Sequence, residues 1–160
     1  MIFRELERKN KKIPHAECIE LLKNERRGVL SVNGEGGYPY ATPINHYYNE
    51  SDGCIYFHCG RARSHRLDAL AASDKACFCL CDEGVRAEGD WELTVRSVVV
   101  FGRIELVDDL DSIRAICAAL SRKFTDDESY IEREIEAFAE STYLLRLRPE
   151  NICGKWVKES

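Results

Sequence analysis

The chain has 160 residues, of which 44% are hydrophobic and 32% are charged, and its formal net charge is −5. This length supports one substantial hydrophobic core, so we expect a single domain over residues 1–160. The negative charge excludes the global basic field that draws proteins to nucleic acids or anionic membranes, and no apolar run reaches the roughly 18 residues of a membrane span.

Eight cysteines raise the question of disulfides. Proteins of oxidising compartments usually carry an apolar secretory signal, whereas this chain starts with the charged run Met1–Arg8. We therefore expect a cytoplasmic protein whose thiols are free.

In the first half of the chain, the apolar pattern predicts one helix and then three strands. The helix covers 16–24, and the strands cover 27–32, 38–48 and 54–59. The segments between the strands are rich in Asn and Gly, which accept positive φ, so the strands form two successive hairpins. Pro39 and Pro43 cannot donate ladder hydrogen bonds, which predicts that their strand lies at a sheet edge or carries a bulge.

The second half alternates strands and helices. Ser64 is placed to cap a short helix, and strands follow at 75–81 and 95–107, the second with a glycine, Gly102, that indicates a bulge or a close approach. One helix carries the apolar stripe from Leu110 to Leu120. A second follows the capping-box spacing of residues 125–128, and a last strand, 143–148, is expected to stop at Pro149.

These elements predict a mainly β protein with short α-helices. About six strands joined mostly by hairpins imply antiparallel pairing. A small antiparallel sheet removes its exposed edges most completely by closing into a barrel, which is the architecture that we expect.

A basic loop precedes the helix that Ser64 caps. Arg61, Arg63, His65 and Arg66 lie within six residues of one another, where free backbone N–H groups and the helix dipole favour an anion. The pattern predicts a phosphate site, and the alternative is a solvated basic turn.

Aromatic side chains crowd the two strands beside this loop. They are Tyr38, Tyr40, Tyr47, Tyr48, Tyr56 and Phe57. Most of them suit a barrel wall, but they also offer ring faces beside a phosphate. Thr42 and Asn45 need hydrogen-bond partners on their strand, and the polar edge of a heterocycle would supply them.

The histidines and cysteines give weaker signals. His58 is either a hydrogen-bonded core histidine or a contact at the mouth of a cofactor pocket, and His65 is the better functional candidate because it lies in the basic loop. The run Cys77-x-Cys79-x-Cys81 places three thiols along one face of a strand instead of around a point, so we expect buried thiols and no metal site. The sequence has no nucleophile elbow, P-loop or Rossmann pattern, so no catalytic residue is assigned and any chemistry must come from a cofactor.

Several stretches together resemble a known family. They are Gly28–Ser31, Gly37–Asn45, Ile55–Cys59, His65–Asp68 and Ser97–Arg103. The chain resembles the pyridoxamine 5'-phosphate oxidase-like flavoproteins, and within them the nitroimidazole-resistance (Nim-type) branch, from about Met1 to Val107.

The resemblance implies a six-stranded antiparallel split β-barrel that binds FMN at the interface of a homodimer. It places the phosphate at Arg63, Ser64, His65 and Arg66. It places the flavin ring against Tyr40, Ala41, Thr42, Pro43, Asn45, Tyr56, Phe57 and His58. Trp91, Arg96 and the tail around Trp156 are candidates to close the site from the partner chain.

The function that the resemblance implies is an FMN-dependent oxidoreductase. NADH, NADPH or another donor would supply electrons to a small acceptor such as a nitroaromatic compound. Asn45 stands where true pyridoxamine phosphate oxidases carry a basic residue, so vitamin B6 oxidation is not expected. One alternative is a non-catalytic protein that stores or senses flavin or haem, with His58 or His65 as axial ligand; another is a structural dimer with a vestigial pocket.

Overall fold

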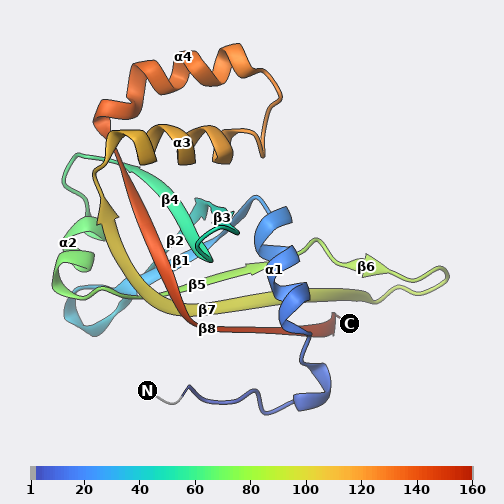
Figure 1. Cartoon of the computed structure of the whole chain (residues 1–160). Helices are drawn as coiled ribbons and strands as arrows, with labels where there is room; N and C mark the ends of the chain where they lie inside the picture. Colours follow the sequence, from blue (N-terminus) through green and yellow to red (C-terminus); the bar gives the residue numbers. More distant parts are fainter. Residues whose placement is uncertain (1–2, 160) are drawn as a thin grey trace.

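The computed structural model describes residues 3–159, so residues 1, 2 and 160 of the expected domain lie outside the described part (Figure 1). The strands are β1 (Arg27–Asn33), β2 (Pro39–Asn45), β3 (Tyr47–Asn49), β4 (Cys54–Gly60), β5 (Lys75–Cys81), β6 (Val85–Arg86), β7 (Leu93–Val107) and β8 (Thr142–Glu159). The α-helices are α1 (His15–Asn24), α2 (His65–Ala72), α3 (Leu110–Ser121) and α4 (Glu128–Phe138). Short 3-10 helices occupy Lys9–Lys11, Glu35–Gly37 and Ala139–Ser141.

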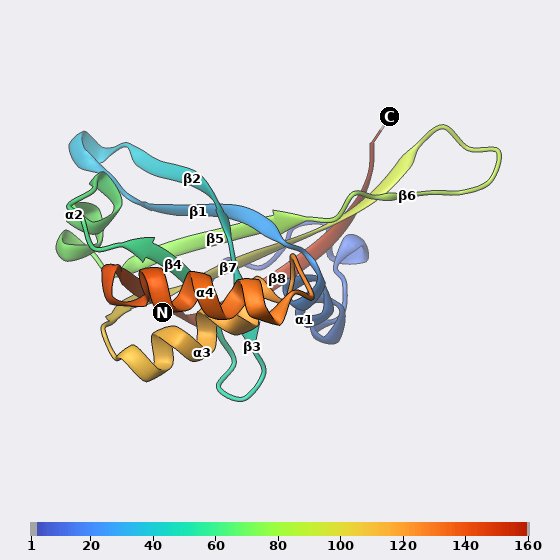
Figure 2. The ribbon, with the colours of Figure 1, turned by 90° about the horizontal axis from the view of Figure 1, so that it is seen from above.

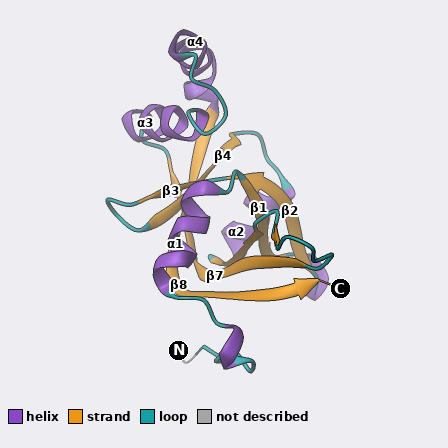
Figure 3. Ribbon diagram, turned by 90° about the vertical axis from the view of Figure 1, so that its right-hand side faces the viewer, coloured by secondary structure: helices purple, strands orange, loops and turns teal. Residues whose placement is uncertain are grey.

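The strands form one antiparallel sheet in the order β2-β1-β5-β7-β8-β4-β3, with β6 paired to β7. The long strands β7 and β8 bend, so the sheet curls into a half-barrel (Figures 1 and 3). The predicted antiparallel, barrel-like class is confirmed, and β2 lies at an edge as its prolines require. The predicted number of strands is wrong, because the sheet of the described residues has eight strands.

One added strand arises at His46, where the predicted strand 38–48 breaks into β2 and β3. The His46 side chain is completely buried and its Nε2 lies 2.8 Å from the Leu22 carbonyl oxygen. Its ring packs against Phe78 with centroids 4.8 Å apart. Tertiary packing therefore redirects the chain at a residue that β-propensity alone treats as part of a strand. The other added strand, β6, has only two residues.

The prediction that Pro149 ends the last strand is also wrong, because β8 continues to Glu159. The β7–β8 register shifts at Phe101/Gly102, and Pro149 is the residue opposite Gly102. A bulge already interrupts the ladder there, so the missing N–H of proline costs no regular hydrogen bond. The predicted close approach at Gly102 is confirmed, since a Cβ there would lie 2.1 Å from the Arg148 carbonyl oxygen.

The two faces of β4 belong to different cores. Ile55 and Phe57 face the main core inside the half-barrel. Cys54 and Tyr56 face a smaller core beneath α3, together with Ile113. Because side chains alternate along a strand, this pattern puts the His58 side chain on the face toward α3 and α4.

The helices α3 and α4 form a layer outside the sheet, with α4 stacked beyond α3 (Figures 1 and 3). Asp109 caps α3 by accepting a hydrogen bond from the Ser112 N–H at 2.8 Å. The N-cap of α4 is Asp127, whose Oδ1 accepts from the Tyr130 N–H at 3.0 Å, and not Thr125 as the capping-box spacing predicts. Asp127 is favoured over Thr125 as the N-cap because a carboxylate is a stronger acceptor than a hydroxyl at the positive end of the helix dipole.

Cys77, Cys79 and Cys81 lie on one face of β5, as predicted, while the residues between them enter the core. The prediction that these thiols are buried is wrong, because Cys77 and Cys79 are only half-buried and Cys81 is exposed on the outer face of the sheet. All eight cysteines are free. Within residues 3–159, no three His, Cys, Asp or Glu side chains gather as a metal site would need. Nor does this part of the chain contain a helix long and apolar enough to cross a membrane.

Candidate functional site

A cleft of about 660 Å³ opens between the edge strand β2 and the end of β4. Residues of β1, β2, β4, the following loop and the start of α2 line it: Arg27, Tyr40, Pro43, Ile44, Asn45, His58, Cys59, Gly60, Ala62, Arg63, Ser64 and Arg66. Figure 2 shows α2 at the end of the sheet where β1, β2 and β4 approach one another. Segments far apart in the sequence thus meet at one opening of the half-barrel.

The start of α2 faces this cleft. The Ser64 side chain is the N-cap and accepts a hydrogen bond from the Leu67 N–H at 3.4 Å. The other N–H groups of a first helical turn have no partner within the helix, and the dipole adds partial positive charge. The predicted cap is confirmed, and the cleft has a helix terminus that favours an anion.

Arg66 is half-buried at the base of the cleft. Its Nη2 donates to the Thr42 Oγ1 at 2.6 Å. Its Nε is fully buried and has no hydrogen-bond partner in the described residues. An unpaired buried donor costs about 1–3 kcal/mol, more for a charged group, so this nitrogen is arranged for an acceptor that the chain itself does not supply.

The other basic residues of the loop differ in role. Arg63 has an 87% exposed side chain and pairs with Asp68 at 3.0 Å, so it can turn toward the cleft at little cost. Arg61 points elsewhere, because it pairs with Asp108 and its guanidinium packs 4.3 Å from the Tyr143 ring centroid.

His65 and Thr42 support the cleft without lining it. The His65 ring stacks on Tyr40 with centroids 4.1 Å apart, which fixes the tyrosine against the cleft. Thr42 positions the guanidinium of Arg66 through the hydrogen bond described above. Both residues therefore act through neighbours that do line the cleft.

Three other residues predicted for this site do not line the cleft. Phe57 is fully buried and packs edge-on against Phe78, with centroids 5.0 Å apart. Tyr56 is buried in the smaller core and its hydroxyl donates to Asp52 Oδ2 at 2.6 Å. Ala41 lies on the exposed outer side of β2. Sequence alone places these residues on the right strands but does not fix which face each one takes.

The sequence interpretation missed Arg27. Its Nε donates to the Asn45 Oδ1 at 3.1 Å, and the two residues are direct partners in the β1–β2 ladder. Counting residue pairs outward from the predicted turn at 33–37 would have placed Arg27 opposite Pro43, because the ladder actually begins with the pair Asn33 and Pro39. The other missed lining residues are Ile44, Cys59, Gly60 and Ala62.

The lining of the cleft carries one sign of charge. It includes three arginines and no carboxylate. A cleft lined by one sign of charge attracts a ligand of the opposite sign, here an anion. The chain as a whole is acidic, so the positive charge is a local property of this site.

His58 stands at the border of the cleft. Partial loss of hydration lowers the pKa of its imidazole below the usual 6.5, so the ring is mostly neutral at pH 7.

Of the residues predicted to close the site of a partner chain, Trp91 is 67% exposed. Arg96 pairs with Asp82 at 2.8 Å, and Trp156 lies beneath the Lys11 ammonium at 5.0 Å.

Comparison with known proteins gives a family match. The sequence profile of the family described as pyridoxamine 5'-phosphate oxidase matches residues 14–156. A search of curated protein sequences gave no significant match.

Solved structures share the fold at low sequence identity. A conserved hypothetical protein of Mycobacterium tuberculosis aligns with a TM-score of 0.79 at 17% identity, over 94% of this chain and 90% of that one. A candidate 5-nitroimidazole antibiotic resistance protein of Bacteroides thetaiotaomicron aligns with a TM-score of 0.74 at 17% identity, over 92% and 87%. A protein of Mycobacterium smegmatis described as binding FAD and haem aligns with a TM-score of 0.68 at 22% identity, over 91% and 72%.

Proposed function

This chain belongs to the pyridoxamine 5'-phosphate oxidase family, and on that premise we propose that it is an FMN-dependent oxidoreductase acting on a small acceptor. The observation that carries the proposal is the buried, unpaired Nε of Arg66 beside the start of α2. The description of the M. smegmatis relative as an FAD- and haem-binding protein supports a flavin as the ligand class.

The phosphate of FMN fits the basic end of the cleft. A terminal phosphate monoester carries about two negative charges at neutral pH. Arg66 would bind it through its guanidinium, Arg63 would leave Asp68 to join it, and the first turn of α2 would donate backbone N–H groups. FMN suits this arrangement better than FAD because only FMN ends in such a monoester.

The flavin ring fits along β2. Tyr40 offers a ring face held by His65, and Asn45 offers its amide at the other end of the strand. The Oδ1 of Asn45 is used by Arg27, which leaves its Nδ2 free to donate to a ring carbonyl. Arg27 also brings a guanidinium beside Asn45, so negative charge at that edge of the ring would be stabilised.

Bound flavin supplies hydride and electron transfer, while the chain supplies position and charge. In the overall reaction NADH or NADPH gives up a hydride and the acceptor takes two electrons and two protons, the second proton coming from water. Asn45 in place of the expected basic residue argues against vitamin B6 oxidation, so we propose a different acceptor, with nitroaromatic compounds as the first class to test.

A homodimer is part of this proposal. The outer face of the sheet carries an uncharged row across four strands, formed by Val29, Cys79, Val99 and Cys153 in register. Val29 is 40% exposed although it is apolar. A second copy seated on this face would bury the row. The β6–β7 arm protrudes from the sheet (Figure 2), and Trp91 between these strands is exposed.

The test is a titration of the purified protein with FMN, FAD and riboflavin, followed by flavin fluorescence. FMN should bind in the micromolar range or tighter, and riboflavin, which lacks the phosphate, should bind at least about tenfold more weakly. Equal affinity for FMN and riboflavin would refute the phosphate site. Reduction of the bound flavin by NADH or NADPH, and its reoxidation by nitroaromatic acceptors, tests the enzymatic part.

Haem is a second candidate ligand because His58 presents a neutral imidazole at the cleft. A neutral imidazole nitrogen is an axial ligand of haem iron. A Soret band that forms with added haemin and is lost in His58→Ala would favour this reading. Tight flavin binding without reduction by either nicotinamide would instead favour storage or sensing.

A further inference from the structure

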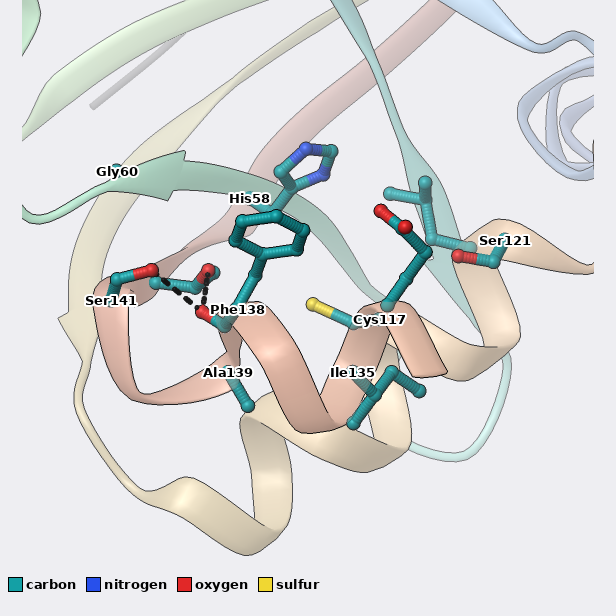
Figure 4. A pocket seen from close by; sticks show the side chains of 11 residues that line it. His58, Gly60, Cys117, Ser121, Ile135, Phe138, Ala139 and Ser141 are labelled. Carbon is teal, nitrogen blue, oxygen red and sulfur yellow. Dashed lines mark hydrogen bonds between the residues drawn. The ribbon is translucent and has the colours of Figure 1, made fainter. Parts of the chain in front are cut away.

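A second cavity adjoins the cleft. It has a volume of about 340 Å³ and lies between the end of β4, the helices α3 and α4, and the start of β8 (Figure 4). His58 and Gly60 line both cavities, so the second one begins where the proposed ring site ends. A molecule in it would lie within reach of a ring held along β2.

The walls of this cavity are mainly apolar. Leu120 and Ile135 come from the facing sides of α3 and α4, and Phe138 closes the lower side beneath His58 (Figure 4). Phe138 is 56% exposed, which is high for an aromatic residue. An exposed aromatic ring at a cavity wall offers a stacking surface to a small ligand.

The charge of the second cavity is opposite to that of the first. Glu134 is its only acidic residue, and no arginine or lysine lines it. Glu134 forms no ion pair within residues 3–159, and the neighbouring Arg133 is directed to the Tyr130 ring, 5.9 Å away. His58 is mostly neutral at pH 7. The hydroxyls of Ser121, Ser141 and Thr142 add further polar groups, and the last two donate to the Phe138 carbonyl oxygen at 2.9 and 2.8 Å.

We propose that this second cavity binds a compact amine, with an apolar ring-sized body against Phe138 and Ile135 and a protonated amino group at Glu134. Any use of this cavity in a flavin reaction rests on the proposed function, but the binding of an amine does not. A volume near 340 Å³ is at the small end of ligand pockets, which limits the ligand to one or two rings.

Three probes with the same ring and different charge test the proposal: benzylamine, benzyl alcohol and benzoate. Binding is followed by amide chemical shifts in a ¹⁵N-labelled protein. Benzylamine should shift amides in residues 117–121 and 134–142 and bind about fivefold to tenfold more tightly than benzyl alcohol, and benzoate should not bind. Benzoate binding as well as benzylamine, or no probe binding in these segments, would overturn the proposal.

Variants separate the two wall contributions. Glu134→Gln should remove the preference for benzylamine over benzyl alcohol, and Phe138→Ala should weaken both probes. The matched control is Glu132→Gln, an exposed carboxylate on the same helix that does not line the cavity. If Glu132→Gln lowers the preference for benzylamine over benzyl alcohol as much as Glu134→Gln does, the amine is attracted only by the overall negative charge of the helix. That result would refute the proposal.

An FMN titration of the same variants keeps the two proposals distinct. Glu134→Gln should bind FMN as the unaltered chain does, because Glu134 does not line the first cleft. Benzylamine binding without any FMN binding would support the amine site and overturn the proposed function. FMN binding without benzylamine binding would support the flavin site and overturn the amine site.

Discussion

Replacing Arg66 with methionine should separate affinity for FMN from stability of the fold. Methionine keeps much of the apolar stem of arginine and removes the guanidinium. In the free protein the substitution removes the hydrogen bond to Thr42, worth about 0.5–1.5 kcal/mol. It also removes the buried Nε that has no partner and costs about 1–3 kcal/mol.

These two changes oppose each other, so the free energy of unfolding of the ligand-free protein should change by less than about 1.5 kcal/mol. The affinity for FMN should fall without any compensation, because a charge-assisted hydrogen bond to the phosphate is lost. Such a bond is worth about 1.5–3 kcal/mol, which corresponds to a dissociation constant raised by about 10- to 150-fold.

The assay pairs urea unfolding of the ligand-free protein with a flavin-fluorescence titration. Arg61→Met is the matched control, since Arg61 is held by Asp108 and Tyr143 outside the cleft. It should leave FMN affinity within about twofold of the unaltered chain. Unchanged FMN affinity in a folded Arg66→Met protein would refute the assignment of the phosphate to this residue.

Three further outcomes are expected. Gly102→Ala should lower the free energy of unfolding by about 3 kcal/mol in urea titrations, since its Cβ would meet the Arg148 carbonyl oxygen at 2.1 Å, whereas Gly60→Ala, with open space around it, should be nearly neutral. Burial lowers the pKa of His46 from 6.5 to about 3. As the pH falls, His46 is therefore protonated in the unfolded chain before it is protonated in the folded one. The resulting loss of stability as pH falls from 6.5 toward 3, at most about 1.4 kcal/mol per pH unit, should be smaller in His46→Gln. Val29→Lys should shift the proposed dimer to a monomer in size-exclusion chromatography with light scattering; a monomeric unaltered chain would contradict the dimer.

Local sequence signals predicted most elements of the fold. The turn glycines, the alternating strand 75–81 and the cap at Ser64 depend on interactions within a few residues, and the structure has them where the sequence indicates. The errors lie where distant segments meet. Pro149 is tolerated inside β8 because β8 itself bulges next to it, at Glu150, and β2 ends before His46 because α1 and β5 supply the packing partners of that histidine.

The candidate site divides in the same way. Arg63, Ser64 and Arg66 could be placed at the cleft from sequence because they belong to the start of a helix, which local sequence defines and which favours an anion. The inward or outward direction of Tyr56, Phe57 and His58 could not, since each face of β4 is buried against a different layer. The alternation of side chains along a strand fixes which residues share a face. Only the packed sheet decides which of the two faces contacts the main core and which contacts the helices.

The sequence by itself therefore determined the antiparallel class, the edge position of the proline-bearing strand and the basic turn that opens α2, because these follow from backbone chemistry over short distances. Tertiary structure alone decided that Arg27 meets Asn45, that Arg66 keeps a buried nitrogen without a partner, and that His58 joins two cavities of opposite charge. Each of these depends on the curl of the sheet, which brings residues many positions apart into contact.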